Sequence, residues 1–254
     1  MNLVIDIGNT NVVVAIKKES EWIHHWRLPT NIEIIASEYE IRMRQFFLES
    51  GIKFSDITKV AISSVVPDLT QRLVEVCEDL FASKPFVIRS EVVAKLDLGN
   101  VINPSEIGSD LVANAVGAYS IYKSSCVIID FGTALTFTSI DDKGYIVGVA
   151  IAPGVKTAMK SLSSNTAKLP EIPLEIPDKF IGTNTIEALQ AGIMQGYVGL
   201  VKHMVAETAK ELGSNPKIIA TGGLSFIFKP LHDTIDKILP NLTLDGILKI
   251  DELS

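Results

Sequence analysis

An apolar run that ends in Asp-x-Gly and continues into a second β-rich run occurs twice in this 254-residue chain. The first copy, LVIDIGNTNVVVAI, covers residues 3–16, and the second, VIIDFGTALTFTSI, covers residues 127–140. Each copy is typical of a β-hairpin with a carboxylate and a glycine at the turn. Aligned without a gap, the copies match at four pairs of positions: Ile5 and Ile129, Asp6 and Asp130, Gly8 and Gly132, Ile16 and Ile140.

The repeated carboxylate indicates more than a turn. Asp6 and Asp130 could be ordinary turn residues, beside glycines that supply a positive φ. A turn needs no carboxylate at the end of an apolar strand, however, and burial there is costly without a cation or hydrogen-bond donors. Backbone amides of residues 8–10 could cradle phosphate oxygens while an aspartate holds the accompanying metal ion. Two such hairpins facing each other across a cleft would bind the phosphate tail of a nucleotide.

The order of the predicted elements supports a duplication. In the first half, a third strand follows the hairpin and helices and strands then alternate, at residues 20–28, 37–51, 58–66, 68–81, 85–89 and 108–122. The order restarts at Cys126 with three strands up to residue 151, followed by elements at residues 183–213, 216–223 and 242–250. This pattern predicts an α/β fold built from a duplicated unit, with domains at residues 1–123 and 124–254.

Local signals refine these elements. Ser37, Asp68 and Asn184 are expected to cap their helices, and Gly213 to end the long one. Residues 162–183 carry three prolines and little periodicity, which predicts an ordered surface loop of the kind that often forms a binding wall.

Charge and composition exclude several classes of function. The net charge of −7 without a Lys/Arg block argues against nucleic acid and anionic membranes as partners. No apolar stretch is long enough to span a bilayer, and the first residues lack the basic region of a signal peptide. Two cysteines give neither a disulfide framework nor a metal-binding spacing. A cytoplasmic protein is expected, and neither a P-loop nor a GxGxxG motif occurs.

Seven ordered motifs resemble the type III pantothenate kinases, within the superfamily of actin, sugar kinases and heat-shock chaperones. They are DIGNTN at Asp6, ISSVVP at Ile62, NPSEIGSDLVANAVGA at Asn103, DFGTALTF at Asp130, APG at Ala152, GTNT at Gly182 and IATGG at Ile219. The resemblance covers nearly the whole chain. It implies two tandem ribonuclease H-like domains with an ATP cleft between them. The implied activity is ATP-dependent phosphorylation of pantothenate to 4'-phosphopantothenate, the first step of coenzyme A biosynthesis.

Two other classes of function stay open at this point. One is a nucleotide-binding regulatory or scaffold protein that kept the fold and lost the reaction. The other is an ATPase or phosphatase of the same superfamily. Asp6, Asp110 and Asp130 together favour an enzyme, because a scaffold has no need of a catalytic base.

The resemblance also implies the role of each candidate residue. Asp110, in Gly108-Ser109-Asp110, would be the general base; it could also cap a helix, and the two roles are compatible because a helix N-terminus favours an ionised carboxylate. ATP would be bound by Asp6, Ile7, Gly8, Asn9, Thr10, Asn11, Val12, Val13 and Thr133. Asp6 would hold Mg²⁺ through the phosphates, and Asp130 a monovalent cation, K⁺ or NH₄⁺. Pantothenate would meet Val101, Gly108, Ser109, Asp110, Leu111 and, from the partner subunit of a homodimer, Thr185.

Two positions depart from the family pattern. Leu111 occupies the place of an arginine, and Val101 that of a tyrosine, and both family residues contact pantothenate. The substrate carboxylate then needs another donor, such as a backbone amide, Lys156 or Lys160. The alternative is a pocket rebuilt for a substrate without that carboxylate, such as pantetheine.

Overall fold

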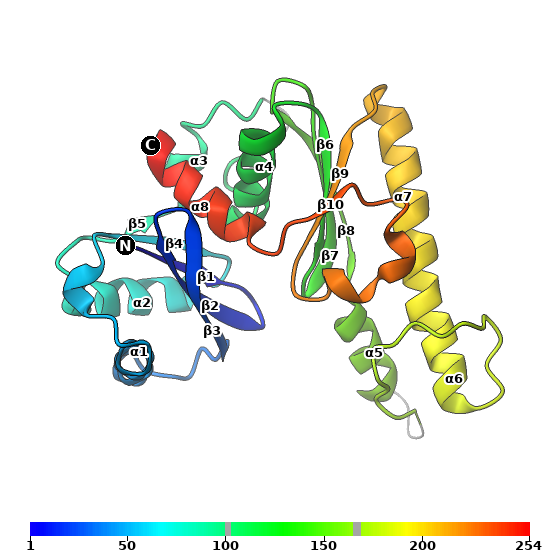
Figure 1. Cartoon of the computed structure of the whole chain (residues 1–254), viewed down its shortest axis with the longest axis horizontal. Helices are drawn as coiled ribbons and strands as arrows, with labels where there is room; N and C mark the ends of the chain where they lie inside the picture. The colour runs from blue at the N-terminus through cyan, green and yellow to red at the C-terminus, as the bar shows by residue number, and fades with distance from the viewer. Residues whose placement is uncertain (100–102, 165–168) are drawn as a thin grey trace. The chain divides into compact units, whose positions relative to one another are not determined.

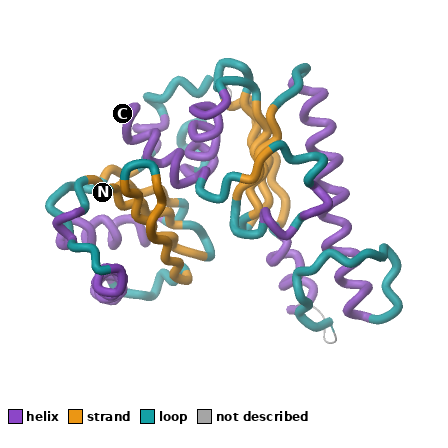
Figure 2. Tube along the Cα trace, viewed as in Figure 1, coloured by secondary structure: helices purple, strands orange, loops and turns teal. Residues whose placement is uncertain are grey.

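The computed structural model describes residues 1–99, 103–164 and 169–254 (Figure 1). The chain forms two compact units, each built around one five-stranded sheet. The first unit contains Met1–Asp97, Asn103–Gly117 and Thr243–Ser254, so the end of the chain returns to it. The second contains Ala118–Leu242 and the short segment that begins at Leu98. Figure 2 shows the strands of each unit gathered into a sheet with helices beside it.

The first sheet has the strand order β3-β2-β1-β4-β5. Its strands are β1 (Asn2–Ile7), β2 (Asn11–Lys18), β3 (Glu21–Pro29), β4 (Lys59–Ser64) and β5 (Phe86–Val87). The first three strands are antiparallel neighbours, whereas β4 is parallel to β1 and β5 is parallel to β4. Strand side chains alternate between faces, so Leu3, Ile5 and Ile7 share one face and Asp6 lies on the other. The Leu3 face is buried with Tyr39 and Leu73, from α1 (Ala36–Ser50) and α2 (Pro67–Leu80).

Three further helices belong wholly or partly to this unit: α3 (Ser90–Val93), α4 (Ser109–Tyr122) and α8 (Leu242–Leu253). Lys17 Nζ and Trp22 Nε1 donate to Asp245, which fastens α8 to the sheet. Gly246 lets α8 approach α4, because a Cβ at this position would overlap the Ala113 carbonyl. The C-terminal helix is therefore a structural part of the first unit.

The second sheet repeats the first, with the order β10-β9-β6-β7-β8. Its strands are β6 (Cys126–Phe131), β7 (Ala134–Ile140), β8 (Ile146–Pro153), β9 (Lys217–Thr221) and β10 (Lys237–Ile238). β6, β7 and β8 form an antiparallel meander, and β9 is parallel to β6. Each of these strands takes the place of one strand of the first sheet, which confirms the predicted duplication.

The predicted long helix is present but interrupted. α6 (Thr185–Gln190) and α7 (Gly196–Leu212) are joined by a π-helical turn at Ala191–Gln195. The expected cap is confirmed, because the Asn184 side chain accepts the Glu187 N–H at 3.0 Å. Gly213 ends α7 with φ 62°, in the left-handed region. The sequence analysis missed α3 and α5 (Val155–Ser164), and the end of α5 overlaps the first residues of the segment 162–183 that was expected to be irregular.

Two predicted caps are wrong. α1 begins at Ala36 after an extended Ile35, without a side-chain cap, so Ser37 already lies inside the helix. α2 begins at Pro67, whose ring favours the first helical position, so Asp68 also lies inside.

The ungapped match of Ile16 with Ile140 is also wrong. Asp6 pairs with Val13, whereas Asp130 pairs with Thr136, so the second turn is one residue shorter. By register, Ser139 occupies the place of Ile16, because these residues pair with Val127 and Leu3.

The predicted boundary near residues 123 and 124 falls between α4 and β6 along the chain. As a domain division it stays a prediction. Among the described residues, no helix is both long enough and apolar enough to cross a membrane.

Candidate functional site

Asp6 lies at the end of β1, beside the turn that leads into β2. The Gly8 N–H closes this turn by donating to the Asn11 carbonyl at 2.9 Å. Thr30 supports it from the side: its Oγ1 donates to the Gly8 carbonyl at 2.6 Å, and its N–H donates to the Thr10 carbonyl at 2.9 Å. Asn9 and Thr10 are exposed at the tip. The turn therefore holds a carboxylate next to a fixed, solvent-facing backbone, which suits phosphate and a cation.

Asp110 lies in the first turn of α4, on a segment that Ser109 fastens to strand β4. The Ser109 hydroxyl donates to the Ser64 carbonyl at 3.0 Å, accepts the Ser64 N–H at 3.1 Å and lies 2.9 Å from Ser63 Oγ. In register, Ser63 is the neighbour of Asp6 across β1 and β4. Asp6 and the N-terminus of α4 therefore belong to the same edge of the first sheet.

The environment of Asp110 suits a proton acceptor. Burial raises the pKa of its carboxyl above the ordinary value of 3.8, and hydrogen bonds from the Leu111 N–H and its own N–H oppose this only in part. The Leu111 N–H lies 2.9 Å from Oδ1. Gly108 provides the space for this carboxylate, because a Cβ there would overlap Oδ1. A carboxylate whose pKa is raised takes up a proton more readily than an ordinary one.

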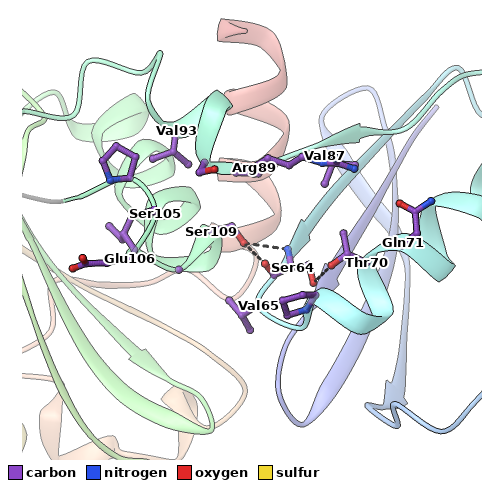
Figure 3. A pocket seen from close by; sticks show the side chains of 16 residues that line it. Ser64, Val65, Thr70, Gln71, Val87, Arg89, Val93, Ser105, Glu106 and Ser109 are labelled. Atoms are coloured by element: carbon purple, nitrogen blue, oxygen red, sulfur yellow. Dashed lines mark hydrogen bonds between the residues drawn. The ribbon is translucent and has the colours of Figure 1, made fainter.

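A cavity of about 510 Å³ lies beside Ser109 in the first unit (Figure 3). Its walls are the ends of β4 and β5, the first turn of α2, residues of α3 and the segment Pro104–Ser109. Ligands of α/β proteins commonly bind at the carboxyl ends of parallel strands, which is where β4 and β5 end. The volume is that of a small-molecule site. Gly108 forms part of the wall, and the Asp110 carboxylate lies against Gly108 without itself lining the cavity.

Asp130, in the second unit, lies between two threonines on neighbouring strands. Thr136 on β7 and Thr221 on β9 are its direct partners in register, so the three side chains share one face of the sheet. Both threonine Oγ1 atoms are buried and have no hydrogen-bond partner in the part of the chain that the structure describes. A buried unpaired hydroxyl costs about 1–3 kcal/mol. Two such oxygens beside a carboxylate fit a cation that coordinates oxygen.

Glycine turns surround this second hairpin. Gly222 follows β9 with φ 86°, and a Cβ there would overlap Asp130 Oδ1 and lie 2.7 Å from the Phe131 nitrogen. The Thr133 carbonyl accepts the Gly154 N–H at 3.0 Å and the Thr157 hydroxyl at 2.7 Å. The start of α5 thus fixes the turn, while Thr133 itself is exposed.

The comparisons with known proteins decide the family. The model of the family described as "Type III pantothenate kinase" matches residues 2–207. The chain belongs to the type III pantothenate kinase family. A curated relative, the type III pantothenate kinase of Halalkalibacterium halodurans, is 38% identical to this kinase over 247 residues, which are 97% of each chain.

Solved structures support the fold. A Campylobacter jejuni protein assigned to the Baf family of transcriptional activators is 20% identical, with a TM-score of 0.60 over 99% of this chain and 98% of its own. A Sinorhizobium meliloti protein described as a 2-dehydro-3-deoxygalactonokinase is 9% identical, with a TM-score of 0.61 over 100% and 96%. At these identities the likeness shows the fold alone, and it confirms the expected α/β fold class.

The remaining predicted residues of this kinase belong to both units. Thr185 is the first residue of α6 in the second unit, where it is exposed. Leu111 is buried in α4, with 9% of its surface accessible. Val101 lies outside the described residues. Lys156 and Lys160 are on α5 in the second unit.

Sequence reasoning missed three residues that the structure places at these sites: Arg89, Thr136 and Thr221. The two threonines carried a usable signal, since each follows from pairing Asp130 with its neighbouring strands. Arg89 carried a weaker one, as a single charge at the end of a short predicted strand.

Proposed function

We propose that Asp110 is the catalytic base of this enzyme, an ATP-dependent kinase that phosphorylates pantothenate in the first step of coenzyme A biosynthesis. One observation supports the assignment: a partly buried carboxylate with a raised pKa lies against Gly108, which lines a ligand-sized cavity at the carboxyl ends of β4 and β5. Membership of the family gives no support to the alternative of a scaffold without activity.

In this reaction the primary hydroxyl of pantothenate attacks the γ-phosphorus of ATP, and ADP leaves. Asp110 accepts the hydroxyl proton, so the new phosphate ester forms without a charged oxonium. Phosphoryl transfer depends mainly on positioning and charge neutralisation, so the base chiefly guides the hydroxyl. Gly108 contributes by leaving room for the carboxylate, and Ser109 by fixing α4 to β4.

The first hairpin is proposed to bind the ATP phosphates and Mg²⁺. Its residues are Asp6, Ile7, Gly8, Asn9, Thr10, Asn11, Val12 and Val13. Asp6 places a carboxylate beside an exposed turn. Mg²⁺ sites in proteins commonly combine one or two carboxylates with the phosphates of the substrate. Mg²⁺ would neutralise charge on the phosphate oxygens. Thr133, exposed on the second hairpin, is proposed to touch ATP.

Asp130 is proposed to bind a monovalent cation, K⁺ or NH₄⁺. The residues fit this group, because the orphaned Oγ1 atoms of Thr136 and Thr221 stand on either side of the carboxylate. Such a cation would add a fixed positive charge near the second hairpin. The hydroxyls of Thr136 and Thr221 would supply neutral oxygen ligands beside the charged oxygens of Asp130.

We further propose that the protein forms a homodimer in the cytoplasm. Phe180, Ile181 and Ile186 flank Thr185 and are 75%, 81% and 50% exposed. Such large apolar side chains are more stable when covered, and a second copy of the chain would cover them. Thr185 would then reach the substrate of the partner subunit. Sedimentation of the purified protein tests this, and a monomer at micromolar concentration would contradict it.

The activity itself is tested by incubation with ATP, Mg²⁺ and K⁺, with and without pantothenate. ADP and 4'-phosphopantothenate should appear in equal amounts, and only with pantothenate. ATP hydrolysis without pantothenate would favour an ATPase, and no turnover in either mixture would favour a scaffold. Replacing K⁺ with Na⁺ tests the monovalent site, and equal rates would contradict it.

A further inference from the structure

The cavity of the first unit has one positively charged wall. Among its lining side chains, Arg89 and Glu106 are the two that carry charge. Figure 3 shows them apart, with Arg89 along the upper edge of the cavity near Val87 and Glu106 below it beside Ser105. The Glu106 carboxylate accepts a hydrogen bond from Asn103 Nδ2 at 2.9 Å, so it is already engaged. The negatively charged group of a ligand would therefore lie near Arg89 and far from Glu106.

The backbone of Arg89 is held on both sides. The preceding Ile88 is 5% exposed, and its N–H donates to the Ile62 carbonyl at 2.9 Å. The Arg89 carbonyl accepts the N–H groups of Val92 and Val93 at 2.9 Å and 3.0 Å. In the part of the chain that the structure describes, no hydrogen bond or ion pair engages its guanidinium. Arg89 is therefore an anchored residue with a charged group available to a ligand.

The substrate needs such a group. Pantothenate carries a hydroxyl at one end and a carboxylate at the other. The hydroxyl end belongs near Asp110, whose carboxylate lies beside the Gly108 wall of the cavity. Leu111 is buried and offers no donor to an anion. A guanidinium binds a carboxylate through two parallel hydrogen bonds, which is stronger than any contact the neutral walls can make.

We propose that Arg89 binds the carboxylate of pantothenate and so determines which end of the substrate lies next to Asp110. This rests on the proposed function and names the specificity residue of its site. The arginine does not enter the chemistry. It fixes the orientation of the substrate, and a ligand without the carboxylate gains nothing from it.

The test compares pantothenate with pantetheine, in which the carboxylate has become a neutral amide. Steady-state kinetics are measured on the wild type, Arg89→Ala and Arg89→Lys. Lys95→Ala is the matched control, because it removes an exposed positive charge from the same segment but lies outside the cavity. Calorimetric binding of pantothenate and thermal melts accompany the kinetics.

Arg89→Ala should raise KM for pantothenate by about tenfold or more, leave kcat within a small factor and leave KM for pantetheine unchanged. Arg89→Lys should give an intermediate KM, because lysine keeps the positive charge but cannot form two parallel hydrogen bonds with the carboxylate. Lys95→Ala should behave as wild type, and all variants should melt as wild type because both side chains are exposed.

An equal rise of KM for both substrates, or no rise for either, would overturn the assignment. The proposed function fails separately, if the wild type turns over neither substrate. Calorimetry still decides the inference in that case: Arg89-dependent binding of pantothenate supports it, and binding that ignores Arg89, or none, refutes it.

Discussion

Replacing Asp110 with asparagine separates the chemical role of this carboxylate from its structural one. Asparagine has nearly the same shape, and its Oδ1 can still accept the Leu111 N–H that lies 2.9 Å away in the native protein. The space left by Gly108 is also unchanged. The fold and the binding of ATP should therefore survive, while the group that accepts the proton is lost.

The size of the effect follows from the loss of one general base. Positioned bases contribute about 10²–10⁴-fold to turnover, which corresponds to roughly 3–5 kcal/mol of barrier. Because the geometry is kept, we expect this loss in kcat rather than in KM. Wild-type turnover should itself fall at acid pH, with an inflection above 3.8, since burial raises the pKa of the essential carboxyl.

Asp110→Asn should lower turnover but should not lower the stability of the fold. The folded state holds the Asp110 proton more tightly than the unfolded state, because the pKa of the folded carboxyl is raised. Unfolding free energy is then greatest below the unfolded pKa and decreases as the pH rises through the folded value. The asparagine variant carries no such penalty. It should melt at or above the wild-type temperature at pH 7.5, with an advantage that shrinks towards pH 4.

The assay combines a coupled measurement of ADP release with thermal melts at both pH values. Near-normal turnover of the variant would refute the role of Asp110 as the base. A variant that is less stable than wild type at pH 7.5 would refute the account of its burial.

Four further substitutions test the sites and the packing, the last as a control. A K⁺ site at Asp130 should make the melting temperature higher in KCl than in NaCl, and Thr221→Val should keep the fold and abolish that difference; an unchanged difference would contradict the cation site. Leu111→Arg should destabilise the protein by about 3–5 kcal/mol in denaturant melts, because it buries an unpaired charge; unchanged stability with tighter pantothenate binding would show that position 111 faces the substrate. Gly246→Ala should cost about 1–3 kcal/mol despite alanine's better helix propensity, because the new methyl meets the Ala113 carbonyl. Gly199→Ala, where a new Cβ meets nothing within 4 Å beyond its own stretch of helix, should have the opposite sign in the same melts.

The sheets were predictable because their signal is long and redundant. Each hairpin joins two apolar runs, and the same order of elements recurs in both halves of the chain. The error at Ile140 came from aligning the copies without a gap, which conceals the shorter second turn. Only the register, set by pairing across strands, reveals it.

Helix starts were less predictable because several residues compete for the same end. Ser37 and Asp68 have side chains that cap well, yet α1 starts after Ile35 and α2 at Pro67. The cap at Asn184 was right, because there the polar side chain and the boundary coincide.

The parts of the site that the sequence missed are those made by tertiary neighbours. Thr136 and Thr221 become partners of Asp130 through strand pairing, over six residues and over ninety-one residues of chain respectively. Their hydroxyls matter because nothing else nearby satisfies them, and a sequence carries no record of unpaired atoms. Arg89 likewise joins the cavity only because β5 ends beside β4.

The buried leucine at position 111 and the exposed arginine at position 89 are consistent with the same physical requirement. A carboxylate ligand requires a positive charge near its end, but it does not require that charge to come from a particular helix. In α4 the side chain after Asp110 is buried, so a guanidinium there would need its own partner. At the end of β5 the side chain reaches the cavity from an exposed segment, and the charge stays hydrated until the substrate arrives. With the proposed ligand charge at Arg89, α4 can bury a leucine beside Asp110, and the raised pKa of Asp110 is easier to maintain without a cation as its neighbour.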